Sequence, residues 1–172
     1  MIPAAEISEQ ISLASTEASG TGNMKLMMNG AVTIGTEDGA NVEIHEAVGD
    51  ENIIIFGMRT PEVTRLRKNG YHPSTYYNNN DELKAALDFI ARGINGQPFE
   101  NIHRILTSVD FYMAAADYKD YCNAQSLASE LYANPLKWNK MSLINIAESG
   151  RFAADRSIKD YADNIWHIKP VE

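Results

Sequence analysis

Two short runs of apolar and β-branched residues, each closed by a glycine, constrain the fold of this 172-residue chain most strongly. The first run covers residues 32–34 and ends at Gly35, and the second covers residues 53–56 and ends at Gly57. The second run is apolar on both faces, which is typical of a strand inside a parallel sheet covered by helices. A short helix from Asn41 onward fits between them as the crossover that parallel strands require. The two runs are therefore predicted to be neighbouring parallel strands.

Helical periodicity dominates the later part of the chain. Apolar residues at positions 83, 86, 87 and 90 follow the spacing i, i+3, i+4, i+7, and a similar stripe occupies positions 158, 161, 162, 165 and 166. The tyrosines and the two tryptophans of the C-terminal half are interpreted as helix-packing residues rather than as a sugar-stacking platform. The polar patch at residues 76–80 is predicted to form a loop. We expect one α/β domain, with the sheet in residues 1–60 and helices over residues 61–172.

Charge and cysteine content narrow the range of partners. The chain has 15 basic and 23 acidic residues, and the resulting net charge of −8 argues against nucleic acid or an anionic membrane as the main partner. Its single cysteine, Cys122, forms no internal disulfide, which favours a reducing compartment such as the cytoplasm. We find no membrane-spanning run and no secretory-signal pattern at the first residues. The four histidines lack metal-ligand spacing, so no metal site is expected.

One segment, residues 17–29, carries the pattern of a binding site and reads E-A-S-G-T-G-N-M-K-L-M-M-N. Gly20 and Gly22 begin like a dinucleotide fingerprint, but Lys25 stands where the third glycine belongs. A glycine-rich turn at a helix start offers backbone N–H groups to a phosphate. A lysine held in apolar surroundings can act as a neutral amine nucleophile. Together these features fit pyridoxal phosphate, and the alternative is a solvated lysine beside a turn that binds nothing.

The same segment resembles the pyridoxal-phosphate attachment signature of the α-glucan phosphorylases, E-A-[SC]-G-x-[GS]-x-M-K-x-x-[LM]-N, at every specified position. The similarity continues over essentially the whole chain, for example at Ile2-Pro3-Ala4-Ala5, Thr36-x-Asp38-Gly39-Ala40-Asn41 and Ile55-Phe56-Gly57-Met58-Arg59. Ser15 and Glu37 depart from the family pattern. The resemblance implies a partial Rossmann-like sheet of GT-B type followed by helices. It corresponds to the latter part of the C-terminal domain of much longer enzymes.

The resemblance also implies a role for each residue of the signature. Lys25 would hold pyridoxal phosphate through an imine, and Thr21 and Gly22 would bind its 5′-phosphate. The glucosyl site would be lined by Glu17, Ala18, Ser19 and Gly20. Taken from the residues alone, Glu17 is a capping or surface acid, and Ser19 and Thr21 make ordinary turn hydrogen bonds. Asp38, which precedes Gly39, is interpreted as a turn residue rather than a catalytic acid.

The activity that the resemblance implies is phosphorolysis of α-1,4-glucan to glucose 1-phosphate by a glycosyltransferase of glycogen catabolism. Its partners would be glucan, inorganic phosphate, the remainder of a phosphorylase chain and a second copy in a homodimer. The basic residues that bind the substrate phosphate in the family have no counterpart here, so we expect this chain to be inactive in isolation. The alternatives are a non-catalytic module that binds a phosphate compound or a partner chain, and an unrelated pyridoxal enzyme.

Overall fold

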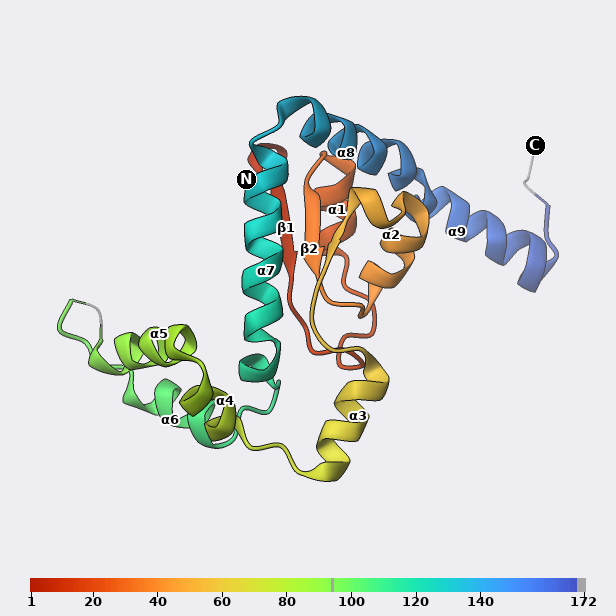
Figure 1. Ribbon diagram of the computed structural model, residues 1–172. Coiled ribbons are helices and arrows are strands. Elements are labelled where there is room, and N and C mark those ends of the chain that lie inside the picture. Colours follow the sequence, from red (N-terminus) through yellow and green to blue (C-terminus); the bar gives the residue numbers. More distant parts are fainter. Residues whose placement is uncertain (94, 170–172) are drawn as a thin grey trace.

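The computed structural model describes residues 1–93 and 95–169 and shows a parallel sheet flanked by helices (Figure 1). The strands lie in the order β1 (Ile7–Gln10), β2 (Val32–Gly35), β3 (Ile54–Ile55). Ile34 lies opposite Ile54 in a parallel register, which confirms the predicted pairing. Strand β1 was not predicted. Its sequence, Ile-Ser-Glu-Gln, contains no apolar run, and it forms a strand by pairing in parallel with β2.

Helices from both ends of the chain cover the sheet. They are α1 (Gly22–Met28), α2 (Ala40–Val48), α7 (Ala114–Tyr132) and α8 (Pro135–Glu148). Val32 and Ile34 of β2 are fully buried and pack against α7 and α8 in one cluster, which includes Trp138. Met27 of α1 and Ile44 of α2 form a second cluster beside the start of β3. The sheet therefore owes its burial to segments that are far apart in the sequence.

The remaining helices extend away from the sheet (Figure 1). They are α3 (Thr60–Asn69), α4 (Pro73–Asn79), α5 (Asp81–Arg92), α6 (Glu100–Ser108) and α9 (Ala154–Tyr161). Every regular element described after residue 60 is helical, so the structure confirms an α/β fold with a helical second part. Among the described helices, none is both long enough and apolar enough to cross a membrane.

The prediction of a loop at residues 76–80 is wrong, because α4 takes up most of that segment. Pro73 occupies the first helical position, where its missing N–H costs nothing. Tyr76 and Tyr77 pack against the cluster formed by Leu83 and Leu87 of α5. This packing outweighs the low helix propensity of the asparagines, as tertiary contacts often do.

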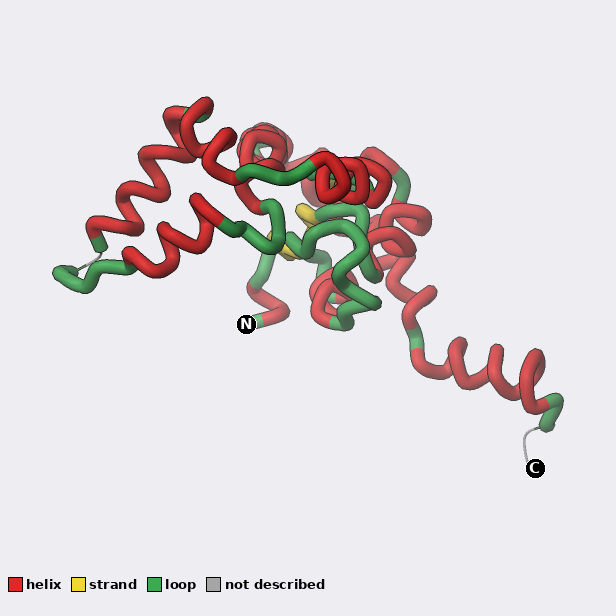
Figure 2. The backbone as a smooth tube through the Cα atoms, turned by 90° about the horizontal axis from the view of Figure 1, so that it is seen from below, coloured by secondary structure: helices red, strands yellow, loops and turns green. Residues whose placement is uncertain are grey.

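The stripe at positions 158–166 does not pack into the core, which corrects the prediction for its aromatic residues. Helix α9 and the π-helical turn Ala162–Trp166 project from the body of the molecule as an arm (Figures 1 and 2). Ile158 is 58% exposed and Trp166 is 54% exposed. Only Trp138, in α8, behaves as the sequence predicted for a tryptophan, with 2% of its surface exposed.

Candidate functional site

A polar cleft of about 220 Å³ lies where the carboxyl ends of β1 and β2 meet. Ligands of open parallel sheets bind in this position, outside the carboxyl ends of the strands. The walls are two connecting loops, one following β1 and one following β2. The lining residues are Glu9, Gln10, Ile11, Ser12, Glu17, Ser19, Gly20, Asn23, Asp38 and Asn41.

Three of the four residues expected to bind sugar come together in this cleft. Glu17, Ser19 and Gly20 line it, whereas Ala18 is exposed beside them. The Glu17 carboxylate is open to solvent and accepts a weak hydrogen bond of 3.4 Å from the backbone N–H of Ser19. Gly20 has a φ of +75°, in the left-handed region that glycine adopts without strain. A free carboxylate beside polar backbone groups suits a ligand that offers several hydroxyl donors.

The opposite wall of the cleft comes from the loop after β2 and from the start of α2. Asp38, in this loop, is 6% exposed, and its carboxylate accepts hydrogen bonds from the backbone N–H groups of Ser15 and Glu17, more than twenty positions earlier in the chain. These contacts are long-range, so they differ from the local turn bonding predicted for Asp38. Asn41 accepts a hydrogen bond from the side-chain amide of Asn23 at 2.9 Å, and both side chains are buried. Neither Asn23 nor Asn41 has a predicted role at the site. The spacing of a single sequence contains no signal that these two asparagines meet.

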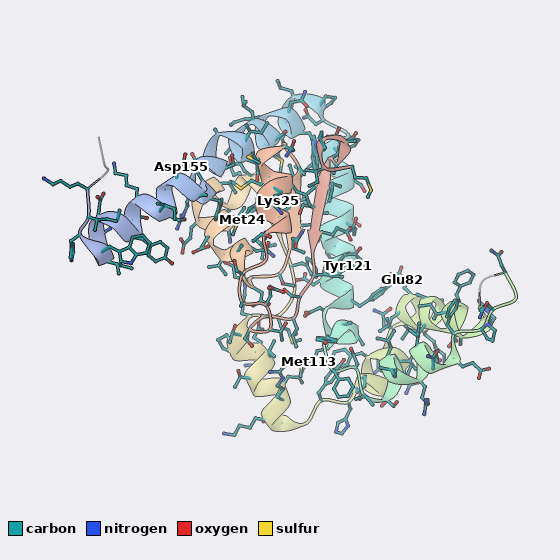
Figure 3. The ribbon with its side chains drawn as sticks, turned by 180° about the vertical axis from the view of Figure 1, so that it is seen from behind. Met24, Lys25, Glu82, Met113, Tyr121 and Asp155 are labelled. Carbon is teal, nitrogen blue, oxygen red and sulfur yellow. The ribbon has the colours of Figure 1, made fainter. Side chains whose placement is uncertain are left out.

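Lys25 lies on α1, one turn after Thr21, and its side chain is exposed (Figure 3). The apolar surroundings predicted for its amine are therefore absent in this chain. The helical period explains the difference, because Met27 lies on the opposite side of α1 and is fully buried, while Met28 is 57% exposed. The N–H of Lys25 donates to the carbonyl of Thr21 at 3.3 Å. Gly22 faces open space, since a Cβ placed there would meet no atom within 4 Å.

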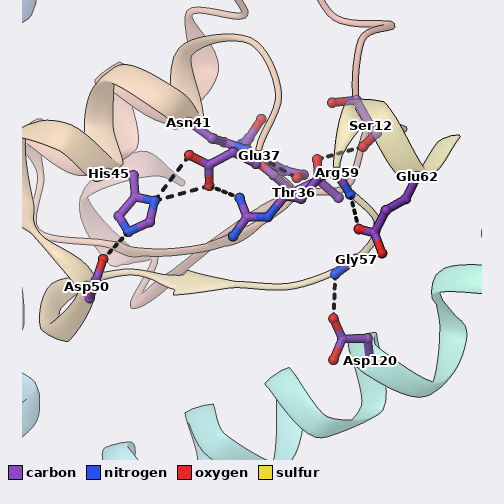
Figure 4. A network of polar contacts seen from close by, with 11 residues as sticks. Ser12, Thr36, Glu37, Asn41, His45, Asp50, Gly57, Arg59, Glu62 and Asp120 are labelled. Carbon is purple, nitrogen blue, oxygen red and sulfur yellow. Dashed lines mark hydrogen bonds and ion pairs between the residues drawn. The ribbon is translucent and has the colours of Figure 1, made fainter. Parts of the chain in front are cut away.

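A network of charges surrounds His45 close to this loop (Figure 4). Its Nδ1 lies 3.1 Å from Oε2 of Glu37, and its Nε2 lies 2.6 Å from Oδ1 of Asp50. Arg59 forms an ion pair with the same Glu37 carboxylate. Burial lowers the pKa of His45, but the hydrogen bonds to Asp50 and Glu37 outweigh it, so the pKa lies above its ordinary value of 6.5. The network ties α2 to the segment that precedes α3.

We expect the His45→Gln substitution to remove a pH-dependent contribution to stability. Because folding raises this pKa, the contribution is fully present below about pH 6.5 and is lost as the pH rises through the folded-state value. The Asp50 side chain is 95% exposed, so solvent screening limits the effect to about 0.5–1 kcal/mol. Urea unfolding at about pH 5.5 and about pH 8.5 measures it. His167→Gln is the control. If His45→Gln lowers the free energy of unfolding by the same amount at both pH values, the prediction is contradicted.

Comparison with known proteins places the chain in a family. The sequence model described as Carbohydrate phosphorylase matches residues 1–168. The chain is 52% identical to the liver form of glycogen phosphorylase from Homo sapiens, over 100% of this chain and 21% of that protein. It is 49% identical to glycogen phosphorylase from Synechocystis sp., over 98% of this chain and 20% of that protein. The chain spans about a fifth of the length of these relatives, and it belongs to the carbohydrate phosphorylase family.

Proposed function

We propose that this chain supplies the cofactor-bearing part of a glucan phosphorylase, which releases glucose 1-phosphate from α-1,4-glucan and inorganic phosphate. The observation that carries the proposal is the cleft where Glu17, Ser19 and Gly20 of the attachment signature meet the loop after β2. Membership in the carbohydrate phosphorylase family supports it. The segments of the relatives that this chain does not match would complete the site. We place the activity in a cytoplasmic homodimer.

In this proposal the chain forms the latter part of a C-terminal domain, with residues 1–60 presenting the site and residues 61–172 supporting it. Glu17 accepts hydrogen bonds from the hydroxyl groups of the glucosyl unit, since its carboxylate is exposed at the cleft. Ala18, Ser19 and Gly20 offer backbone N–H groups to the same sugar. Binding several hydroxyls at once fixes the orientation of the ring before the bond to the glucan breaks.

Lys25 and the turn before it fit pyridoxal phosphate, the cofactor of this family. The amine of Lys25 is exposed, and none of the ion pairs among the described residues involves it. The open space at Gly22 lets a phosphate approach the backbone, and the N–H groups of Thr21 and Gly22 are the donors expected to bind it. When bound, the cofactor supplies a phosphate that exchanges a proton with the substrate phosphate. Lys25 would hold it covalently through its amine.

We expect Lys25 to be the lysine that pyridoxal phosphate modifies first. The chain is incubated with the cofactor at a low molar ratio, reduced with borohydride and digested, and the labelled peptide is identified by mass spectrometry. Label should concentrate on the peptide that contains Lys25, and Lys25→Ala should remove most of it. Lys140→Ala is the control and should leave the pattern unchanged. Label spread evenly over the surface lysines would contradict a preformed cofactor site.

A further inference from the structure

The carboxylate of Asp38 binds three consecutive backbone N–H groups of the segment that leads to Glu17. Its Oδ1 accepts from Ser15 at 2.8 Å, and its Oδ2 accepts from Glu17 at 2.8 Å and from Thr16 at 3.3 Å. Asp38 follows β2 and is separated from these residues by more than twenty positions. The only other backbone partner described for these three N–H groups is the carbonyl of Leu13, which accepts from Thr16.

The residues after Asp38 contact the same segment at its far end. The N–H of Ala40 donates to the carbonyl of Ser19 at 2.6 Å. Gly39 has a φ of +50°, and a Cβ placed on it would lie 2.5 Å from the Ser19 carbonyl oxygen and 2.9 Å from Cγ of Glu17. The loop after β2 therefore fits against the Glu17 turn so closely that position 39 has no room for a side chain.

Asn41 extends the contact to the start of α1. Its side-chain N–H groups donate to the carbonyl of Thr36 at 2.9 Å, while its Oδ1 accepts from Asn23. Asn41 is 2% exposed, and so is Asn23. The loop after β2 thus binds the turn that bears Glu17, and the start of α2 binds the helix that bears Lys25.

We propose that Asp38 is a positioning residue for substrate binding, which acts by holding the backbone of residues 15–17 so that the Glu17 carboxylate faces the sugar. The inference rests on the proposed function for the identity of the ligand. A buried carboxylate that accepts three N–H groups restrains the turn strongly, because hydrogen bonds to a charged group are about twice as strong as neutral ones. Among the described residues, the only hydrogen bond to the Glu17 carboxylate is its weak contact with Ser19. The position of its carboxylate therefore depends on Asp38.

Asp38→Asn tests the inference, because the amide keeps the shape of the side chain but replaces one acceptor oxygen with a donor. In this variant we expect the backbone amides of Ser15 and Glu17 to exchange with solvent about tenfold to a hundredfold faster, measured by NMR. Glu37→Gln is the matched control, because Glu37 is the adjacent acid but contacts His45 and Arg59 instead. Unchanged exchange at Ser15 and Glu17 in a folded Asp38→Asn chain overturns the proposal.

Titration with D-glucose, followed through the amide signals of residues 17–20, separates positioning from a purely structural role. We expect Asp38→Asn to weaken glucose binding about tenfold. Ile34→Val, which removes one buried methylene from the core, should lower stability by about 1 kcal/mol and leave the glucose affinity unchanged. Fast exchange combined with wild-type glucose affinity in Asp38→Asn overturns the proposal. An unmodified chain that shows no glucose-dependent shift contradicts the assignment of the cleft as the glucosyl site, and amide exchange still decides whether Asp38 holds the turn.

If Asp38→Asn does not fold, Gly39→Ala takes its place. This variant keeps the Asp38 carboxylate and displaces the Glu17 turn by steric conflict with Ser19. It should shift the amide signals of residues 17–20 and weaken glucose binding. Gly150→Ala is its control, since a Cβ there meets no atom within 4 Å. Wild-type glucose affinity in Gly39→Ala overturns the proposal.

Discussion

Purified as it stands, the chain will release glucose 1-phosphate from glycogen and phosphate at a rate at least about a thousandfold below that of a complete relative. The reaction of the proposed enzyme brings the phosphate of the cofactor close to the substrate phosphate. Two such anions repel each other by several kcal/mol at contact distance, so cationic side chains must offset them. The lining of the cleft has three acids, Glu9, Glu17 and Asp38, and no lysine or arginine.

Two arginines close to the segments that form the site are already engaged. Arg59 pairs with Glu37, and Arg151 donates to Glu46 at 3.0 Å. The cleft is also open to water, which removes the gain from preorganised donors and from exact placement of the reactants. A coupled assay for glucose 1-phosphate, with pyridoxal phosphate added, measures the rate. The liver glycogen phosphorylase of Homo sapiens serves as the positive control. Sustained turnover close to that control would show that this chain assembles a complete site.

Trp138→Ala will lower the free energy of unfolding by about 3–5 kcal/mol, which is a large part of the stability of a typical domain. The indole is 2% exposed and lies in the cluster that joins α7 and α8 to the sheet. Its Nε1 donates to Oε2 of Glu6 at 3.3 Å, and its ring meets Tyr132 edge to face at a centroid distance of 5.1 Å. The substitution leaves a cavity in the core and removes the hydrogen bond to Glu6.

Leu136→Ala provides the matched control on the same helix. Leu136 is 83% exposed, so its truncation should change stability by no more than about 0.5 kcal/mol. Urea unfolding followed by circular dichroism measures the free energy of unfolding of both variants. The slope of that free energy against urea concentration serves as a check on two-state behaviour. If both substitutions shift the midpoint equally, the cluster around Trp138 does not hold the sheet.

Strands β2 and β3 are predictable because their signal is local. Each is a run of apolar residues closed by glycine, and the structure pairs Ile34 with Ile54 as expected. Strand β1 lacks such a run, and its Ser8 is fully buried although it is polar. Ser8 Oγ accepts a hydrogen bond from the Gln10 side chain, so the polar group is paired inside the sheet. Long-range pairing creates this strand, and no short window of sequence shows such pairing.

In the candidate site, too, residues carried by one local segment are predictable, whereas residues brought in by long-range pairing are not. The signature locates Glu17, Ser19 and Gly20, because one continuous turn carries them. It does not locate Glu9 and Asn41, which reach the cleft from β1 and α2 through the parallel topology of the sheet. The methionines around Lys25 suggest an apolar environment only while the helical period is ignored. Once that period is applied, Met27 alone faces the core.

The dependence of the sheet on helices that come much later has a consequence for biosynthesis. Glu6, which lies just before β1, cannot form its hydrogen bond with Trp138 until the ribosome has added another 132 residues. At a translation rate of 5–20 residues per second, the ribosome needs roughly 10 s to add that length. During this interval Val32 and Ile34 lack α7 and α8, the late helices that bury them, although their own strand is already made. The nascent chain therefore exposes an apolar, aggregation-prone sheet surface for seconds. Chaperones that bind such surfaces will decide how much of the chain reaches the folded state.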